Sequence, residues 1–391
     1  MDKILVLDAN QRSALAIIRS LGRRGVKVIA ADHRPHPIGA ASRYVASSIR
    51  YSDPGTSPGA FVQDVVTAAD RLDIDIVIPA TDLTTMLLAS QPDLCNSVRL
   101  AAPKAGSYET LTDKAHLFQL AAGLGIPAPV TRVASTLAEA LDAAHDVGFP
   151  AVLKPARSKY VKGNQVLSTS VEIVRDPYAL SASFHNQNWL GDIPCLVQKF
   201  VPGHGAGIFA LYGPSGPVAW FAHKRIREKP PTGGVSVLSE SVPLDPMMQS
   251  IASRLLAAAD WTGVAMVEFR IASDGTPYLI EVNGRFWGSL QLAIDCGVDF
   301  PWLLYQLIQG MPMPKPQSYE VGRRLRWLLG DFDSLIAQLK TTPSDFKHRA
   351  GAIAAFARTF ADTGCRQEIM RLNDPRPAIS EVRQWAQGLF K

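Results

Sequence analysis

The first hundred residues alternate between strand-like and helix-like segments, and this alternation limits the folds that the chain can adopt. Residues 3–7 form a short apolar run, Ser13 is predicted to cap a helix with one apolar stripe, and residues 26–31 form a second apolar run. A third run at 74–79 precedes another helical segment. Repeated strand–helix–strand units produce a parallel sheet covered on both faces. We therefore expect residues 1–105 to form a Rossmann-like parallel α/β domain.

The first turn of this domain argues against a dinucleotide site. Asp32 ends the second strand, where an acid that binds ribose would stand, but the turn at residues 8–13 contains no glycine. Without glycine, the backbone is not shaped for close approach to a pyrophosphate. A dinucleotide-dependent oxidoreductase is therefore a less favoured alternative.

The composition narrows the class of protein. With 391 residues, 47% of them hydrophobic, the chain can form two or three domains. The chain has 40 Lys and Arg residues against 35 Asp and Glu residues, and the basic residues form no long block. We therefore do not expect nucleic-acid binding. The apolar stretch at residues 4–7 is too short for a signal peptide, and no run reaches the about eighteen apolar residues of a membrane span. Four widely separated cysteines fit a reducing compartment, so we expect a cytoplasmic protein.

Two strand-like segments in the last third of the chain carry acidic side chains. Residues 263–269 include Glu268, and residues 278–285 include Glu281. The turn-forming sequence at 273–276 lies between them and predicts a hairpin in which the two glutamates are side by side. Two neighbouring carboxylates repel each other unless a cation lies between them, and Mg²⁺ prefers oxygen ligands. The pattern therefore predicts a metal site.

The second segment continues with polar residues at alternate positions. Glu281, Asn283 and Arg285 share one face of an extended strand, and Ile280 and Val282 take the other. Asn283 would add an amide oxygen to the site for Mg²⁺, with Mn²⁺ as the alternative metal. A half-exposed strand with a polar outer face is the other interpretation of this pattern.

Several ordered motifs across residues 105–310 resemble the ATP-grasp superfamily of carboxylate-amine ligases, which includes biotin carboxylase, carbamoyl-phosphate synthetase and D-alanine ligase. The motifs are Thr112-Asp113-Lys114, Val152-Leu153-Lys154-Pro155, the run from Leu196 to Gly203, Val267-Glu268-Phe269, and Ile280 to Arg285. The resemblance implies an α+β ATP-grasp domain at 106–315, with a small lid subdomain at about 115–205. An α/β domain commonly precedes such a domain. Residues 316–391 would be a C-terminal extension of mixed strand and helix.

The resemblance also implies ATP and Mg²⁺ as cofactors. Lys114 and Lys154 match the two family lysines that contact the nucleotide phosphates. Arg285 is expected to face the transferred phosphate, because a guanidinium can bind two oxygens at once. The matches to the metal ligands of the family are Glu268, Glu281 and Asn283.

Adenine is expected against the strand that links the two halves of the domain. Gln198, Lys199 and Val201 match the family's adenine-binding backbone segment, and Phe200 and Val201 offer apolar cover to the ring. Many relatives have an acid for the ribose hydroxyls next, but this chain has a glycine-rich stretch that contains His204. His204 is therefore either a ribose partner or an ordinary loop residue.

Two basic segments are predicted to close over the ligands. Residues 156–164 follow Lys154 and contain only one glycine, so we expect electrostatic clamping of phosphates. Residues 223–225 lead into a double-glycine segment at 230–236. Arg225 is predicted to bind a carboxylate or phosphate of the substrate, and a solvated charged hairpin is the alternative.

These features predict an ATP- and Mg²⁺-dependent ligase that activates a carboxylate as an acyl phosphate for attack by an amine or similar nucleophile. Its partners would be a small-molecule carboxylate and an amine, and a homodimer is compatible with the sequence. An ATP-grasp kinase or phosphotransferase is the first alternative, followed by the oxidoreductase and a non-catalytic nucleotide-binding module. The residues do not identify the substrates, the base, or the role of residues 316–391.

Overall fold

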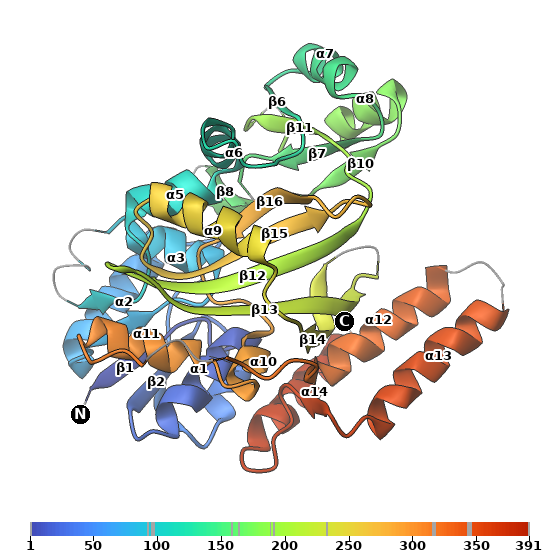
Figure 1. Cartoon of the computed structure of the whole chain (residues 1–391). Helices are drawn as coiled ribbons and strands as arrows, with labels where there is room; N and C mark the ends of the chain where they lie inside the picture. Colours follow the sequence, from blue (N-terminus) through green and yellow to red (C-terminus); the bar gives the residue numbers. More distant parts are fainter. Residues whose placement is uncertain are drawn as a thin grey trace.

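The computed structural model describes most of the chain (Figure 1). The described residues are 2–91, 94, 98–157, 159–162, 165–187, 189–190, 192–231, 234–314, 318–341 and 346–389. Parts of the two basic segments fall outside them, namely Ser158, Gly163, Asn164, Thr232 and Gly233. Within the described residues, no helix combines the length and apolar character needed to cross a bilayer.

The N-terminal part is a five-stranded sheet in the order β3-β2-β1-β4-β5, and every pair in it is parallel. This confirms the predicted parallel α/β fold. The strands are β1 (Lys3–Val6), β2 (Lys27–Asp32), β3 (Val45–Arg50), β4 (Ile76–Ile78) and β5 (Arg99–Leu100). The helices are α1 (Arg12–Gly22), α2 (Pro58–Leu72) and α3 (Asp82–Ala89), with a 3₁₀ turn at Ile38–Ala41.

Alternation along β1 explains how the sheet is covered on both faces. Ile4 and Val6 pack into a core that includes α1, whereas Leu5 and Leu7 pack into a second core that includes α2. The predicted cap at Ser13 is wrong, because α1 already begins at Arg12. A tight turn in which the Gln11 amide donates to the Asp8 carbonyl (2.7 Å) starts the helix earlier.

A second, antiparallel sheet in the order β10-β7-β11-β6 forms the upper part of the molecule (Figure 1). On β7, Ala151 and Leu153 pack into the core with α7 and α8, so Val152 and Lys154 point to the opposite face. The strands are β6 (Thr131–Ala134), β7 (Ala151–Pro155), β10 (Glu172–Val174) and β11 (Cys195–Lys199), with a separate hairpin of β8 (Lys159–Lys162) and β9 (Gln165–Ser168). Helices α7 (Leu137–Val147) and α8 (Pro177–Asn186) pack on this sheet, whereas α5 (Ala105–Thr112) and α6 (Lys114–Gly123) contribute to the core of the largest sheet.

The largest sheet has seven strands in the order β16-β15-β12-β13-β14-β17-β18, and only the β17–β18 pair is parallel. Its strands are β12 (His204–Gly213), β13 (Gly216–Lys229), β14 (Val235–Ser241), β15 (Gly263–Ile271), β16 (Pro277–Asn283), β17 (Arg324–Arg326) and β18 (Cys365–Gln367). The remaining helices are α9 (Pro246–Ala258), α10 (Leu290–Asp295), α11 (Phe300–Ile308), α12 (Leu328–Thr341), α13 (Phe346–Ala361) and α14 (Arg376–Leu389).

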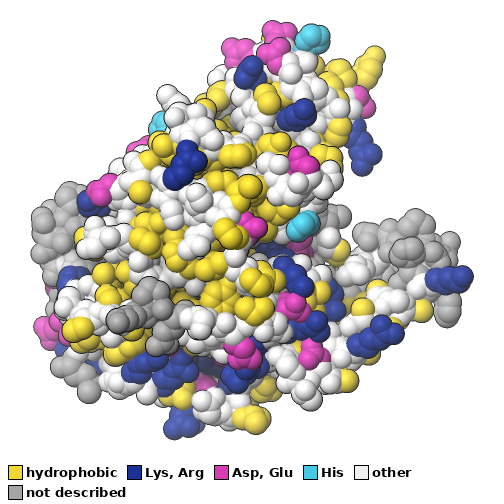
Figure 2. Space-filling view, viewed as in Figure 1, with side chains coloured by type: hydrophobic (Ala, Val, Ile, Leu, Met, Phe, Trp, Pro, Cys, Tyr) yellow, Lys and Arg dark blue, Asp and Glu magenta, His cyan; other side chains and the backbone are white. Residues whose placement is uncertain are grey.

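The seven-stranded sheet is buried on both faces. Ile208 and Ala210 of β12 pack into a core with α9, and Phe209 and Leu211 pack into the core that also contains α1, α10 and α11. Helices α10 and α11 therefore lie between this sheet and the N-terminal domain, and α12, α13 and α14 extend to one side (Figure 1). On the face shown in Figure 2, Lys and Arg side chains are interspersed with Asp and Glu.

Candidate active site

The two predicted acidic strands form a hairpin, β15–β16, in which Glu268 pairs directly with Glu281. The turn between them is tight. The Ala272 amide donates to the Thr276 carbonyl at 3.0 Å, and Gly275 adopts a positive φ of 86°. This pairing confirms the hairpin that the sequence predicts.

A β-bulge next to this pair sets the direction of the side chains. Beyond the two glutamates, Phe269 pairs with Leu279, so Ile280 is an extra residue in β16. Bulges commonly redirect side chains beside functional sites. Leu279 and Val282 consequently pack in the same core, and Ile280 does not share the buried position predicted for it beside Val282.

The paired carboxylates are surrounded by groups that neutralise them. The Asn283 side chain donates to Glu268 at 3.1 Å and to Glu281 at 3.3 Å. Arg225 forms an ion pair with Glu268 at 3.0 Å, and Lys114 forms one with Glu281 at 3.4 Å. Residues from three separate parts of the chain thus meet at one point of the sheet.

The pKa values of the two glutamates move in opposite directions. Burial, together with repulsion from Glu281, raises the pKa of Glu268 despite the nearby Arg225. Burial also opposes ionisation of Glu281, but Lys114 and Lys154 outweigh it and lower the pKa of Glu281. The pair therefore holds one firmly ionised carboxylate and one that retains a proton more readily.

Both predicted phosphate-binding lysines are buried, and the charges of both act on Glu281. Lys114 is the first residue of α6, and its amide is fixed by the Ala156 carbonyl at 3.0 Å. Burial lowers the pKa of Lys154 to about 8, although the charge of Glu281 opposes this change. The charges of two buried lysines thus favour the ionised form of Glu281.

Arg285 lies beyond the end of β16 and connects the site with the N-terminal domain. Its guanidinium contacts the Asp82 carboxylate at 3.1 and 3.2 Å, and it donates to the Asn283 side-chain oxygen at 3.2 Å. Asp82 is the first residue of α3. Arg285 therefore orients Asn283, which in turn contacts both glutamates.

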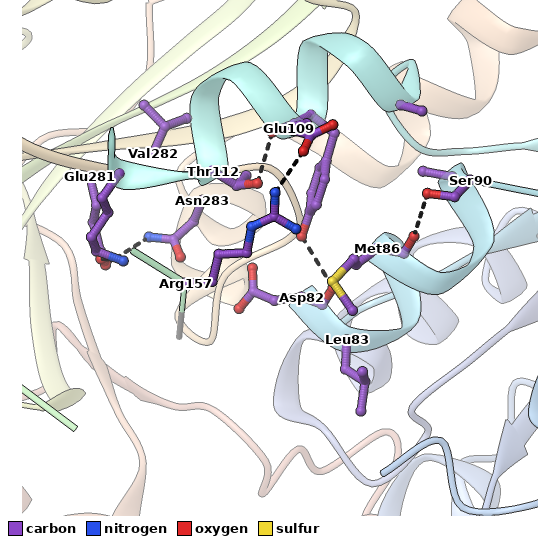
Figure 3. Close-up of a pocket in the computed structure, with 14 residues that line it drawn as sticks. Asp82, Leu83, Met86, Ser90, Glu109, Thr112, Arg157, Glu281, Val282 and Asn283 are labelled. Carbon is purple, nitrogen blue, oxygen red and sulfur yellow. Dashed lines mark hydrogen bonds and ion pairs between the residues drawn. The ribbon is translucent and has the colours of Figure 1, made fainter. Parts of the chain in front are cut away.

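Two cavities meet at Glu281 and Asn283. The smaller, of about 140 Å³, lies between β16, α3 and α5, and Figure 3 shows Asp82 and Arg157 among the residues that line it. The larger, of about 370 Å³, is lined by residues of β13, β14, β15 and β16 and by the segment that follows β16. Its lining combines charged groups with an apolar wall, and its charged members are Arg12, Arg225, Glu268, Glu281 and Arg285.

Arg157 reinforces the start of α6 beside the smaller cavity. It contacts Asp113 at 2.9 Å and Glu109 at 2.6 Å, the latter contact being drawn in Figure 3. Asp113 also caps α6 by accepting from the Ala115 amide at 3.0 Å. These contacts fix the position of the adjoining Lys114.

His223 lies on the wall of the larger cavity as a neutral imidazole. Burial, followed by the charge of Arg225, lowers the pKa of His223 to about 3. One ring nitrogen is hydrogen-bonded to the Ser289 hydroxyl at 2.7 Å, and the ring stacks on Phe209. His223 thus contributes a polar atom without adding charge.

The residues expected near adenine lie apart from these cavities, at the connection from β11 to β12. Gln198 is buried, and its side chain donates to Thr131 at 2.8 Å. Lys199 and His204 are exposed, and Phe200 and Val201 are partly buried. Nothing in these contacts assigns His204 to ribose, so its role stays a prediction.

The site contains residues that the sequence did not single out for it. Asp82 was not among the residues considered for the site, and Arg12 was considered only as part of the segment 8–13 that lacks glycine. Their contacts with the large sheet join positions more than two hundred residues apart. No local pattern in the sequence signals such contacts.

The donor atoms fit a magnesium ion that completes its shell with oxygens from another molecule. Among the described residues, no group of three or more His, Cys, Asp and Glu side chains is placed to hold a metal by itself. Glu268 and Glu281 supply two carboxylates. The Asn283 amide group turns its nitrogen towards them and its oxygen towards Arg285, so its oxygen joins this set only after a half-turn of the amide group. Mg²⁺ bound in this way typically retains water or phosphate oxygens.

A family model described as "ATP-grasp in the biosynthetic pathway with Ter operon" matches residues 194–330. The chain is 28% identical over 322 residues to an uncharacterised protein, y4rH, of Sinorhizobium fredii, covering 75% of this chain and 62% of that protein. It is 29% identical over 169 residues to N5-carboxyaminoimidazole ribonucleotide synthase of Pseudomonas aeruginosa, covering 43% of this chain and 44% of that one. It thus spans less than two thirds of the length of these relatives.

Solved structures share the fold at low sequence identity. Biotin carboxylase from Campylobacter jejuni superposes with a TM-score of 0.66 at 16% identity, covering 83% of this chain and 74% of that one. N5-carboxyaminoimidazole synthase from Aspergillus clavatus, solved with ADP and its aminoimidazole ribonucleotide, superposes with a TM-score of 0.64 at 17% identity, covering 83% and 80%.

Proposed function

The chain belongs to the ATP-grasp superfamily, and we propose that it is an ATP- and Mg²⁺-dependent ligase. In this proposal the enzyme phosphorylates a small-molecule carboxylate and then joins it to an amine or similar nucleophile. ADP and phosphate would be released. The relatives named for D-alanine ligation and for N5-carboxyaminoimidazole ribonucleotide synthesis support this reaction class.

The observation that carries the proposal is the direct pairing of Glu268 with Glu281 opposite two buried lysines. Structural stability alone does not account for it, because buried like charges and desolvated ammonium groups destabilise a fold. A ligand with phosphate groups and a bound cation would satisfy both sets of charges at once.

We assign Glu268, Glu281 and Asn283 as the metal ligands. A bound Mg²⁺ would supply neutralisation of charge on the transferred phosphoryl group. Arg285 donates to the amide oxygen of Asn283, and in this proposal a half-turn of the amide group releases that oxygen from Arg285 to the metal. Arg225 limits the repulsion between the carboxylates by pairing with Glu268.

Lys114 and Lys154 are assigned to the phosphates of ATP, where positioned positive charge lowers the barrier to phosphoryl transfer. Arg285 and Arg225 are assigned to oxygens of the transferred phosphoryl group and of the substrate carboxylate. The connection between β11 and β12, with Gln198, is assigned to adenine. The cytoplasmic location and the homodimer stay predictions.

A kinase on the same fold is the second candidate, because the same charges would serve transfer to a stable acceptor. The two reactions differ in their products. A ligase releases both ADP and inorganic phosphate and needs an acid and an amine together. A kinase releases ADP alone and accumulates a phosphorylated product.

The experiment is therefore to measure ADP and phosphate separately over a panel of acid and amine pairs. Equal release of both, dependent on both substrates and on Mg²⁺, is the result expected of the ligase. The Glu281→Gln variant should lack this release while keeping the wild-type circular dichroism spectrum. Metal-dependent turnover at the wild-type rate in that variant would refute the site assignment.

A further inference from the structure

The larger cavity has a wall that comes from the N-terminal domain. Arg12, the first residue of α1, lines it together with residues of the seven-stranded sheet. Arg12 follows the turn whose lack of glycine argues against a dinucleotide. The guanidinium of Arg12, at the end of the first strand-to-helix connection, therefore lies at the cavity that Glu268 and Glu281 also line.

Arg12 is held in place by the C-terminal part of the chain. It forms an ion pair with Glu368, and its guanidinium lies 4.1 Å from the ring centre of Trp327. The side chains of Arg12 and Glu368 are only 11% and 3% exposed. Both terminal nitrogens of Arg12 also contact the Ser236 carbonyl, at a long distance of 3.4 Å.

A neighbouring glycine makes room for this arrangement. A Cβ atom at Gly288 would lie 2.8 Å from one terminal nitrogen of Arg12. Any larger residue at position 288 would push the guanidinium out of its place. The close packing and the buried partner acid together keep Arg12 at the cavity wall.

The pairing of Arg12 is not explained by stability. A buried salt bridge often contributes no more to stability than an apolar pair of similar volume. Arg225 is bonded to Glu268, and Arg285 to Asp82. Within the described residues Arg12 contacts neither glutamate of the hairpin, and its weak contacts with the Ser236 carbonyl leave donors for another acceptor.

The cavity has the size of a small metabolite. Its volume of about 370 Å³ lies near the lower end of the range for small-molecule sites. Met266, Val235 and Trp287 give it an apolar wall, and Ser236 and Ser289 add polar groups. A short carbon chain with charged ends matches this lining, whereas a peptide or nucleic acid would exceed the volume.

We propose that Arg12 binds a carboxylate of the substrate acid other than the one that reacts, so that the substrate is a small acid with two carboxylate groups. The reacting carboxylate lies by the glutamates and Arg285, and the second lies on the guanidinium of Arg12. The inference rests on the proposed function, because that function defines the reacting end. In this proposal the C-terminal part of the chain positions Arg12 through Glu368 and Trp327.

The test compares acids that differ only in the second carboxylate. Succinate and butyrate, and likewise glutarate and valerate, are titrated calorimetrically against the full-length protein with Mg²⁺ and a non-hydrolysable ATP analogue. Succinate or glutarate should bind, and the matched monocarboxylate should bind about ten- to hundredfold more weakly, as expected for the loss of a charge-assisted pair. Inorganic phosphate serves as a competitor that reveals a general anion site.

Two variants address Arg12 directly. Arg12→Lys retains the charge but loses the two-pronged geometry, and it should weaken dicarboxylate binding about tenfold while affinity for the ATP analogue is unchanged. In the double variant Arg12→Gln/Glu368→Gln, no buried acid is left without its partner, so the fold is protected. Arg23→Gln is the control, because Arg23 lies on the same helix and pairs with Asp299 away from this cavity.

The outcomes separate the two proposals. Equal binding of succinate and butyrate, binding unaffected in both Arg12 variants, or phosphate binding as tight as that of the dicarboxylates would overturn the role of Arg12. Absence of binding by every dicarboxylate, with normal binding of the ATP analogue, would overturn it as well. Failure of the wild type to bind the ATP analogue would instead count against the ATP-dependent function. In that case, titration of the dicarboxylates without nucleotide would still test whether Arg12 binds the second carboxylate.

Discussion

Glu268 and Glu281 lie opposite each other in adjacent strands, yet only Glu281 faces the ammonium group of Lys114, at 3.4 Å. This unequal environment explains why the pKa of Glu281 is lowered and that of Glu268 is raised. In the absence of a bound cation the repulsion between the two acids is relieved by protons and by Arg225. A cation would relieve it for both acids at once, which links metal binding to the stability of the hairpin.

The first prediction concerns Glu281→Gln. Because the substitution preserves shape and removes one charge, the protein should fold normally but lose at least about a hundredfold in Mg²⁺-dependent ADP release. The measurement is ADP formation at saturating ATP, with the circular dichroism spectrum as the check on folding.

Glu240→Gln is the matched control for this variant. Glu240 also belongs to the seven-stranded sheet and also pairs with basic residues, Lys224 and Arg324, but it does not line either cavity. Its turnover should stay within about twofold of wild type, since the loss of a peripheral ion pair changes little. Equal loss in both variants would show that the effect is not specific to the site.

The second prediction concerns the stability of Glu268→Gln without metal. The folded state raises the pKa of Glu268, so its contribution to stability is fully present below the pKa of the unfolded chain and is lost as pH rises through the folded value. At neutral pH the wild type therefore carries an unfavourable buried charge. The free energy of unfolding of the variant should be greater by about 1 kcal/mol, so it should unfold at a higher urea concentration. Arg225 is not left without a partner in the variant, because it keeps its ion pair with Glu228.

Addition of Mg²⁺ with ATP should reverse this order, because only the wild type retains both carboxylates for the ion. The same comparison at a pH of about 4.5 is the internal control, since there the difference between wild type and variant should shrink. If the wild type is the more stable protein at neutral pH without metal, the assigned repulsion between the two acids is wrong.

The third prediction is a pH dependence of ATP binding. The pKa of Lys154 is lowered to about 8, so its ammonium charge is present below that pH and is lost above it. Affinity of the free protein for ATP should fall above about pH 8, by up to about tenfold per pH unit if binding requires the charged form. Titration with a fluorescent ATP analogue across this range measures the effect.

Lys154→Arg tests the assignment to this residue, because a guanidinium stays protonated throughout the range. Its affinity should be flat where that of the wild type declines. The same decline in both proteins would place the titrating group elsewhere.

The local parts of this site could be predicted from the sequence. The turn at 273–276 and the alternation around it gave the pairing of Glu268 with Glu281, because a short turn fixes strand register. The bulge at Ile280 was not predictable from the same pattern. An inserted residue leaves the alternation of residue types nearly unchanged while it shifts which face they occupy.

The distant contacts of the site could not be predicted. Asp82 reaches Arg285, and Glu368 reaches Arg12, only after the N-terminal sheet and the seven-stranded sheet have been packed together. Neither acid stands in a motif whose spacing carries information about its partner. A mixture of strand and helix was expected for residues 316–391, but the parallel pairing of Arg324–Arg326 with Cys365–Gln367 depends on the packing of the intervening helices.

The last prediction concerns the segment that joins the four-stranded antiparallel sheet to the seven-stranded sheet. Gly203 has a φ of 147°, and a Cβ atom there would lie 1.9 Å from the Ile271 carbonyl oxygen. Gly203→Ala should therefore cost at least about 2 kcal/mol in the free energy of unfolding, because the backbone of two chain segments must move apart. Urea denaturation measures the loss.

Gly205→Ala is the control two residues further on, where nothing lies within 4 Å of the added methyl group and where φ is ordinary. Its free energy of unfolding should stay within about 0.5 kcal/mol of wild type. If Gly203→Ala is equally neutral, the close approach to Ile271 does not constrain the connection. If instead it is destabilised and its remaining folded fraction binds ATP more weakly while Gly205→Ala binds normally, the geometry of this connection determines how the nucleotide is held between the two sheets.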